Sequence, residues 1–191
     1  MGIAAARKAG MSEKHSAAMS DAQTDPKGVV FIEDREPQAV VSIRSIVAVA
    51  ELAQAQSERL SELWRSMQAR DLAPVGPPFV RYHTFGETDT DVELGVPVRK
   101  EATGEGRIEA GSLPGGAAIV TWHLGAHNSL GEAYGRLNAW LEQQGREAAG
   151  PAWEVYWWID ARREPDPSSW PEPAQWRTEL VQPVARMEGE P

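Results

Sequence analysis

The chain has 191 residues, of which 41% are hydrophobic, so it can form one domain with a real core or two small fused modules. It contains no cysteine, which excludes a disulfide framework, a thiolate nucleophile and a thiolate metal site. The net charge is −9, whereas a nucleic-acid-binding domain usually carries a cluster of basic residues, which this sequence lacks. This acidity either favours cationic ligands mildly or only keeps the protein soluble.

The two ends of the chain carry weak structural signals. Residues 1–27 are rich in Ala, Ser and small polar residues, and we expect a disordered extension without room for a helix-turn-helix module. Residues 185–191 are expected to form a C-terminal tail. No segment approaches the roughly 20 apolar residues of a membrane span, and the N-terminus lacks the apolar centre of a secretion signal. We therefore expect a cytoplasmic protein without a membrane partner.

The first half of the fold, about residues 28–100, is predicted to hold one helix among strands. The helix covers about residues 50–70, because apolar side chains recur at i, i+3, i+4 and i+7 from Leu60. A run of Pro and Gly between 74 and 78 ends it. The strands expected in this half are 29–32, 39–44, 79–85 and 91–98.

The second half, about residues 101–184, repeats this order. A short strand around 107–110 and a strand over 119–124 precede a helix that Gly145 ends. Ser129 and Glu132 have the spacing of a capping box at the start of that helix, whose apolar stripe includes Tyr134. The last strand is expected over 176–184.

The most informative stretch is 151–160, an aromatic and β-branched run that predicts a single strand. Side chains alternate along a strand, so two sets of residues point to opposite faces. Trp153, Val155, Trp157 and Ile159 are predicted to form a core face. Glu154, Tyr156, Trp158 and Asp160 form the other face, which could hold a flat, apolar and cationic molecule.

Several short motifs occur in a characteristic order. They are Gly-Pro-Pro-Phe at 76–79, Asp-Val-Glu-Leu-Gly-Val-Pro-Val at 91–98, Leu-Pro-Gly-Gly at 113–116, and Trp-Glu-Val-Tyr at 153–156. Together they resemble the GyrI-like small-molecule-binding domains, the effector-binding half of several multidrug-responsive transcription regulators. The resemblance covers roughly residues 28–184 and implies a stand-alone member of that family.

An internal repeat predicts the fold independently of this resemblance. Val-Glu-Leu-Gly-Val-Pro-Val at 92–98 is similar to Thr-Glu-Leu-Val-Gln-Pro-Val at 178–184. We therefore predict an α+β fold of duplicated strand-helix-strand-strand modules with pseudo-twofold symmetry. Its antiparallel sheet carries both helices on one side and a ligand cleft between the halves, as the resemblance also implies.

Glu154 is the leading candidate for a functional residue. An unpaired carboxylate among aromatic side chains costs several kcal/mol to bury or has a raised pKa, and it matches the pocket glutamate of the resembled family. The alternative is a glutamate paired with an arginine at a wet strand end. Tyr156, Trp158 and Tyr82 could stack on a ligand or could belong to an ordinary aromatic core. The sequence indicates no metal site and no cofactor, and it carries no signal for an oligomeric state.

Three functions remain open at this point. The first is binding of aromatic small molecules, cationic ones among them, such as drugs or toxins. The second, implied by the resemblance, is hydrolysis of cyclopropane-bearing DNA-alkylating natural products, with Glu154 as base and Tyr156 or Tyr82 as donor. The third is interaction with a macromolecule, as in a gyrase inhibitor.

Overall fold

The computed structural model of the protein describes residues 28–99 and 102–186; the predicted extension and residues 187–191 of the predicted tail lie outside this range. Eight strands form one antiparallel sheet in the order β1-β6-β8-β7-β3-β4-β2-β5. The strands are β1 (Val30–Arg35), β2 (Gln38–Ala48), β3 (Phe79–Phe85), β4 (Asp89–Pro97), β5 (Glu109–Leu113), β6 (Gly116–Leu124), β7 (Trp153–Tyr156) and β8 (Arg177–Pro183).

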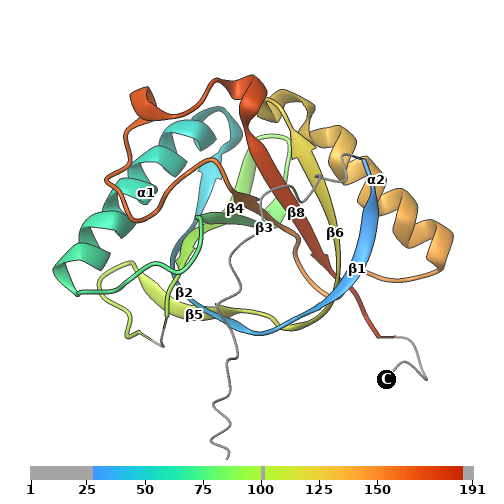
Figure 1. Ribbon diagram of the computed structural model, residues 1–191, viewed down its shortest axis with the longest axis horizontal. Helices are drawn as coiled ribbons and strands as arrows, with labels where there is room; N and C mark the ends of the chain where they lie inside the picture. Colours follow the sequence, from blue (N-terminus) through green and yellow to red (C-terminus); the bar gives the residue numbers. More distant parts are fainter. Residues whose placement is uncertain (1–27, 100–101, 187–191) are drawn as a thin grey trace, which may run out of the picture.

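Two helices cover one face of this sheet, α1 (Leu52–Ala69) and α2 (Leu130–Gln144). The sheet curls into a half-barrel with both helices on its outer face (Figure 1). Gly145 ends α2 in the left-handed conformation, with a φ of 61°, as a C-terminal glycine commonly does. The predicted α+β class, with helices on one side of an antiparallel sheet, is confirmed.

The strand order is equivalent when it is read from either edge. The unit β2-α1-β3-β4 occupies one half of the sheet and β6-α2-β7-β8 the other, and the halves meet where β3 pairs with β7. The edge strands are exchanged between the halves. β1 precedes the first unit in the chain but pairs with β6, whereas β5 precedes the second unit but pairs with β2. Each half is therefore completed by a strand from the other half of the sequence.

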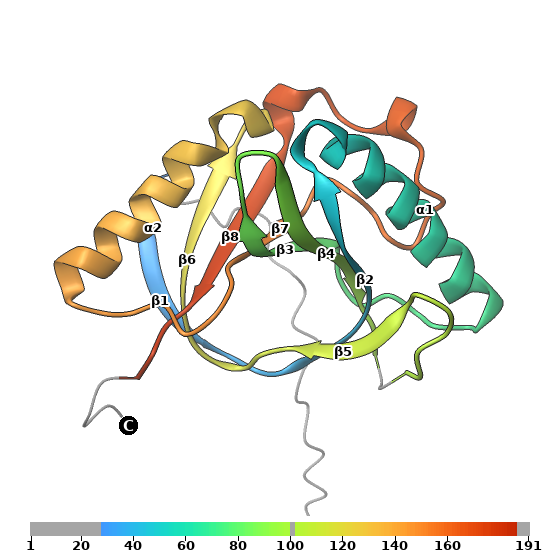
Figure 2. The same ribbon diagram turned by 180° about the vertical axis from the view of Figure 1, so that it is seen from behind.

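The two links that carry this exchange touch each other. In Figure 2 the β1–β2 and β5–β6 connections pass one another at the bottom of the sheet. A Cβ atom on Gly115 would lie 2.6 Å from Cδ of Pro37 and 2.8 Å from the carbonyl oxygen of Arg35. Only a residue without a side chain permits this approach.

The two faces of the sheet form separate cores, because alternate side chains point in opposite directions. Leu63 and Met67 of α1 pack on the outer face of one half, and Ala133 and Leu137 of α2 pack on the outer face of the other. The inner face of the half-barrel has its own buried cluster. Its members are Val40, Phe79, Leu113, Ala118, Val120, Trp153, Val155 and Val181.

The strand predicted over 151–160 is much shorter in the structure, where β7 has only four residues. β7 ends at Tyr156, because the N–H of Ile159 bonds the carbonyl of Tyr156 and closes a turn. The alternation predicted for this stretch therefore stops at the turn. Trp157, predicted in the core, is 52% exposed, and Ile159 is buried on the α1 side instead of beside Trp153.

The predicted capping box at the start of α2 is also wrong. Ser129 caps the helix by position, but its side chain makes no capping hydrogen bond. A short 3-10 turn, His127–Ser129, precedes the helix, and the Ser129 hydroxyl bonds back to the carbonyl of Ala126.

Within the described residues, no helix is long and apolar enough to cross a membrane.

Candidate functional site

Glu154 lies near the middle of the sheet, on its outer face. β7 is flanked by β3 and β8, and Glu154 stands directly between Val80 and Leu180 on these neighbours. Both partners are fully buried, and Glu154 itself is only 3% exposed. The sequence thus places a carboxylate where an aliphatic side chain would be expected.

The chain has three tyrosines, and all three gather around this carboxylate. Tyr134 on α2 donates a 2.8 Å hydrogen bond to Oε1 of Glu154, and Tyr156 on β7 donates one of 2.8 Å to Oε2. Tyr82 on β3 interacts through its hydroxyl with Tyr156. Its hydroxyl also accepts a hydrogen bond of 3.4 Å from the amide of Gln56 on α1. Two strands and both helices therefore converge on one buried carboxyl group.

The electrostatics of this cluster are set by burial. Burial raises the pKa of Glu154 above its ordinary value, although the hydrogen bonds from Tyr134 and Tyr156 act in the opposite direction. Within the described residues, no basic side chain contributes to this shift. Burial and the nearby Glu154 also raise the pKa values of the three tyrosines, so all three remain protonated donors at neutral pH.

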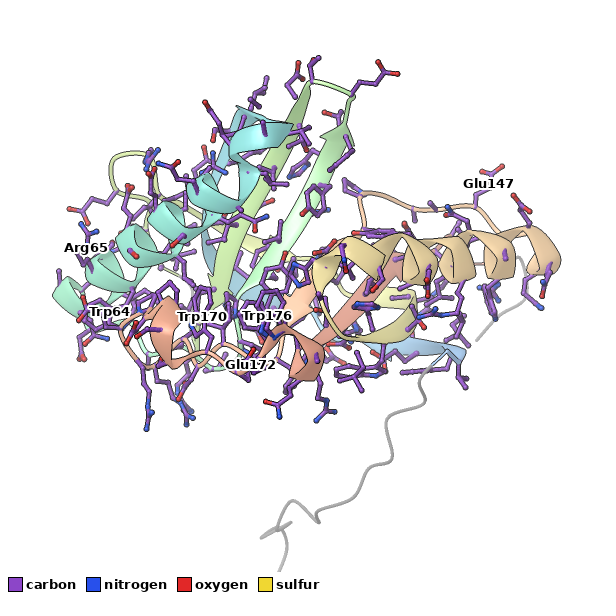
Figure 3. All side chains as sticks on the ribbon, turned by 90° about the horizontal axis from the view of Figure 1, so that it is seen from above. Trp64, Arg65, Glu147, Trp170, Glu172 and Trp176 are labelled. Atoms are coloured by element: carbon purple, nitrogen blue, oxygen red, sulfur yellow. The ribbon has the colours of Figure 1, made fainter. Side chains whose placement is uncertain are left out.

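An aromatic cluster continues from Tyr156 along the segment after β7. Trp158 stacks on Tyr156 with ring centroids 5.6 Å apart, and Trp176 stacks on Trp158 at 4.1 Å with the planes 4° apart. Trp170 meets the edge of Trp158 at 5.1 Å. Figure 3, which looks down on both helices, shows Trp170 and Trp176 on the segment that runs from the side of α1 towards α2.

His127 completes the aromatic cluster from the start of α2. Its ring lies 5.0 Å from those of Tyr156 and Trp176, and its Nε2 is 3.3 Å from the hydroxyl of Thr178. Burial lowers the pKa of His127 from 6.5 to about 4, with a smaller effect from His123. The ring is therefore neutral at physiological pH and packs as an aromatic group.

The structure brings the four predicted site residues into one region. Glu154 and Tyr156 share the outer face of β7, as the alternation predicted, and Tyr82 approaches them from β3. Trp158 also stacks on Tyr156, but a turn and not a strand places it there. Nothing in the sequence pattern marked that turn.

Sequence reasoning missed Tyr134, Gln56, His127 and Trp176 as members of the region. Tyr134 was assigned to the apolar stripe of its helix, and its ring does pack on the α2 cluster while its hydroxyl reaches Glu154. The rarity of tyrosine was a usable signal, because the two tyrosines already predicted left only one more to place.

The arrangement allows few kinds of chemistry. Among the described residues, no three His, Asp or Glu side chains come together as metal ligands. The site instead offers a closed carboxyl group, neutral hydroxyl donors and stacked rings. Each carboxylate oxygen accepts one tyrosine hydrogen bond and keeps a second lone pair that a ligand could use.

Comparisons with known proteins agree with this description. Over 83% of its length, the chain matches the C-terminal domain of EcmrR with 25% identity and a TM-score of 0.69, covering 98% of that domain. It also matches the EcmrR chain of an EcmrR–DNA complex with 25% identity and a TM-score of 0.70, but spans only 58% of that chain. A hydrolase from Listeria innocua has the same fold, with 12% identity and a TM-score of 0.57 over 85% of this chain and 94% of the hydrolase.

Among curated proteins, none matches the sequence. The model of the GyrI-like small molecule binding domain matches residues 29–185, which is nearly the whole of the described fold. The chain belongs to the GyrI-like small molecule binding domain family.

Proposed function

We propose that the chain binds planar aromatic small molecules, cationic ones among them, at Glu154 and the aromatic side chains around it. The observation that carries this proposal is a buried carboxyl group whose hydrogen-bond donors, among the described residues, are Tyr134 and Tyr156. The free protein keeps this group at a cost, because burial disfavours its charged form. A cationic ligand would supply the missing opposite charge.

Stacking supplies the remaining affinity in this proposal. The rings of Tyr156, Trp158 and Trp176 already stack on one another, so a flat ligand finds aromatic faces at one end of the site. Burying roughly 300 Å² of apolar surface at about 25 cal/mol per Å² gives about 7 kcal/mol before the cost of association. Less the cost of association, this contribution alone falls short of the roughly 8 kcal/mol of micromolar binding, so the proposed affinity also depends on the charge at Glu154.

The similarity to EcmrR supports the binding proposal for the domain alone. The chain is similar to the C-terminal domain of that protein and spans 58% of the EcmrR chain seen with DNA. We therefore propose no nucleic-acid contact for this domain, in keeping with its acidic charge. We expect it to act in the cytoplasm on ligands that enter the cell.

The test compares a cation with a neutral molecule of the same shape. Titration calorimetry measures the binding of 1-methylquinolinium and of quinoline, at about pH 8 where quinoline is neutral. In the Glu154→Gln variant, affinity for the cation should fall by about tenfold or more, and affinity for quinoline should change little. Equal weakening of both ligands, or no binding of either, would refute the role of the charge.

A second candidate function rests on the same carboxyl group. A raised pKa makes Glu154 a stronger base than an exposed glutamate, and tyrosine hydroxyls lie within 2.8 Å of it. In this alternative, Glu154 removes a proton from water and the water oxygen attacks a cyclopropane carbon. The ring bond that breaks releases its electron pair to a conjugated carbonyl, whose oxyanion accepts a hydrogen bond from Tyr156 or Tyr82. Protonation of this intermediate completes the addition of one water.

Mass spectrometry separates the two functions. A cyclopropane-bearing compound recovered with the mass of one added water, and recovered unchanged after incubation with Glu154→Gln, would establish turnover. The same compound retained by the wild-type protein at unchanged mass would establish binding without chemistry.

A further inference from the structure

The inner face of the half-barrel holds a cavity on the side of β7 opposite to Glu154. Its volume is about 340 Å³, within the range of pockets that bind small molecules. β7 and the residue after it contribute Trp153, Val155 and Trp157 to its lining, while Glu154 and Tyr156 belong to the other face. A single segment of the chain therefore lines two separate regions.

The floor of this cavity is apolar and rigid. Four residues of its lining belong to the buried cluster inside the half-barrel, namely Phe79, Leu113, Trp153 and Val155. The Phe79 ring packs so closely on Gly95 that a Cβ there would come within 2.5 Å of it. Phe79 and Trp153 are thus packed beneath the cavity, and Val155 and Leu113 supply the small apolar surface that its floor exposes.

The wall of the cavity is an aromatic ring fixed by a hydrogen bond. Trp157 is 52% exposed, so part of its ring is accessible to a molecule in the cavity. Its Nε1 donates a 3.0 Å hydrogen bond to Glu179, and its ring lies 5.9 Å from that of Trp122. The ring thus stands at the cavity in one orientation.

The charges around the cavity differ from those at Glu154. Glu179 is buried but forms an ion pair with Arg35, so its charge is already compensated. Of the other rim carboxylates, Glu33 also pairs with Arg35 and Asp34 pairs with Arg186, so much of the negative charge of the rim is compensated.

We propose that this cavity is a second ligand site, which takes a small, neutral, planar aromatic molecule. The ligand lies against the exposed ring of Trp157, above Val155 and Leu113. Its charge preference follows from the two carboxylates: in the part of the chain that the structure describes, Glu154 has no basic partner, whereas Glu179 has Arg35. The cavity is thus complementary to a neutral ring system, and the outer site to a cation.

The first arm of the test uses 1-methyl-4-quinolone, a neutral bicyclic ring with a carbonyl acceptor. Calorimetry should show that Trp157→Ala weakens its binding by about tenfold, because the stacking wall is lost. The neighbouring Trp158→Ala variant, which alters the outer aromatic cluster, should leave its affinity within about twofold. Loss of quinolone binding in Trp158→Ala would place the ligand at the outer site and overturn the proposal.

The second arm does not depend on removing a large side chain. The sequence has no cysteine, so a Val155→Cys variant carries a single thiol in the cavity lining. Bound quinolone should slow alkylation of this thiol by iodoacetamide at least about fivefold. Ser112→Cys, at an exposed position outside the cavity lining, is the control and should react at the same rate with and without the quinolone.

The outcomes also separate this site from the outer one. Protection of the Val155→Cys thiol with failure of 1-methylquinolinium to bind would support the cavity and refute the proposed function at Glu154. If 1-methylquinolinium binds but the quinolone neither binds nor protects the thiol, the cavity site is refuted and the proposed function at Glu154 is supported.

Discussion

Tyr134 on α2 donates a 2.8 Å hydrogen bond to Glu154 on β7, and so connects the second helix to the centre of the sheet. Tyr156 occupies the other carboxylate oxygen from the same strand as Glu154. Each oxygen therefore has one strong donor, but within the described part of the chain neither has a cation. Burial without an opposite charge makes the fold less stable than an apolar or amide residue at this position would.

The first prediction concerns the stability of the Glu154→Gln variant. The folded pKa of Glu154 lies above the ordinary value of 4.5, so the unfolded chain ionises first as the pH rises. Stability is therefore lost as the pH rises from about 4.5 towards the folded pKa. Glutamine avoids this loss, and the variant should be more stable by about 1–2 kcal/mol at neutral pH.

Urea unfolding at several pH values measures this effect. The stability advantage of the glutamine variant should shrink towards zero near pH 4. At that pH, Glu154 of the wild-type protein is largely protonated in both the folded and the unfolded state. An advantage that does not depend on pH would mean that packing, and not charge, distinguishes the two side chains.

The second prediction concerns Tyr134→Phe, which removes one donor and keeps the ring. At about pH 8 the variant should lose about 1–2 kcal/mol of stability, because a hydrogen bond to a charged acceptor is lost. In the Glu154→Gln background the same change should cost about half as much, since the remaining bond is between neutral groups. A double-mutant cycle from denaturant unfolding gives this coupling directly, and a coupling of zero would show that the bond contributes nothing in solution.

The third prediction concerns His127, which responds to pH in the opposite sense. Its folded pKa of about 4 lies below the ordinary 6.5, so the unfolded state takes up a proton first as the pH falls. Stability should drop between about pH 6.5 and about pH 4, by at most about 3 kcal/mol because the ring is only partly buried.

A His127→Phe variant isolates this effect. It preserves the ring contacts with Tyr156 and Trp176 but cannot take up a proton. Relative to the wild-type protein, its stability should rise as the pH falls through this window. Because Glu154 and His127 act in opposite directions in overlapping ranges of pH, the wild-type curve alone would hide both contributions. Parallel curves for the variant and the wild-type protein would mean that His127 is protonated in the folded state as easily as in the unfolded one.

Much of the fold could be predicted because it rests on local patterns. The period of the apolar residues located both helices, and alternation placed Glu154 and Tyr156 on one face of β7. The repeat between the halves gave the element order. The exchange of β1 and β5 could not be predicted, because neither short edge strand carries a pattern that selects its partner.

The same limit applies to the candidate site. The chain leaves β7 after Tyr156 through a turn with the sequence Tyr-Trp-Trp-Ile, which contains no glycine, proline or asparagine to mark it. Trp157 and Trp158 were therefore assigned to faces of a strand that does not continue. Tyr134 could not be assigned from its helix alone, because the ring packs as a core residue and only the hydroxyl reaches Glu154.

The last prediction tests the crossing of the two links that exchange the edge strands. In Gly115→Ala, the new methyl group would meet Pro37 Cδ at 2.6 Å, Pro37 N at 2.7 Å and the Arg35 carbonyl oxygen at 2.8 Å. Two of these are backbone atoms and the third belongs to a rigid ring, so no side chain can move aside. The variant should lose about 2–3 kcal/mol of stability. Gly135→Ala is the matched control, since nothing lies within 4 Å of a Cβ there and the residue is exposed within α2. That control should gain about 0.5–1 kcal/mol, because alanine favours the helix. If thermal unfolding showed the two variants to be equally stable, the β1–β2 and β5–β6 connections would not be in contact at Gly115. The exchanged edge strands would then be held by strand pairing alone.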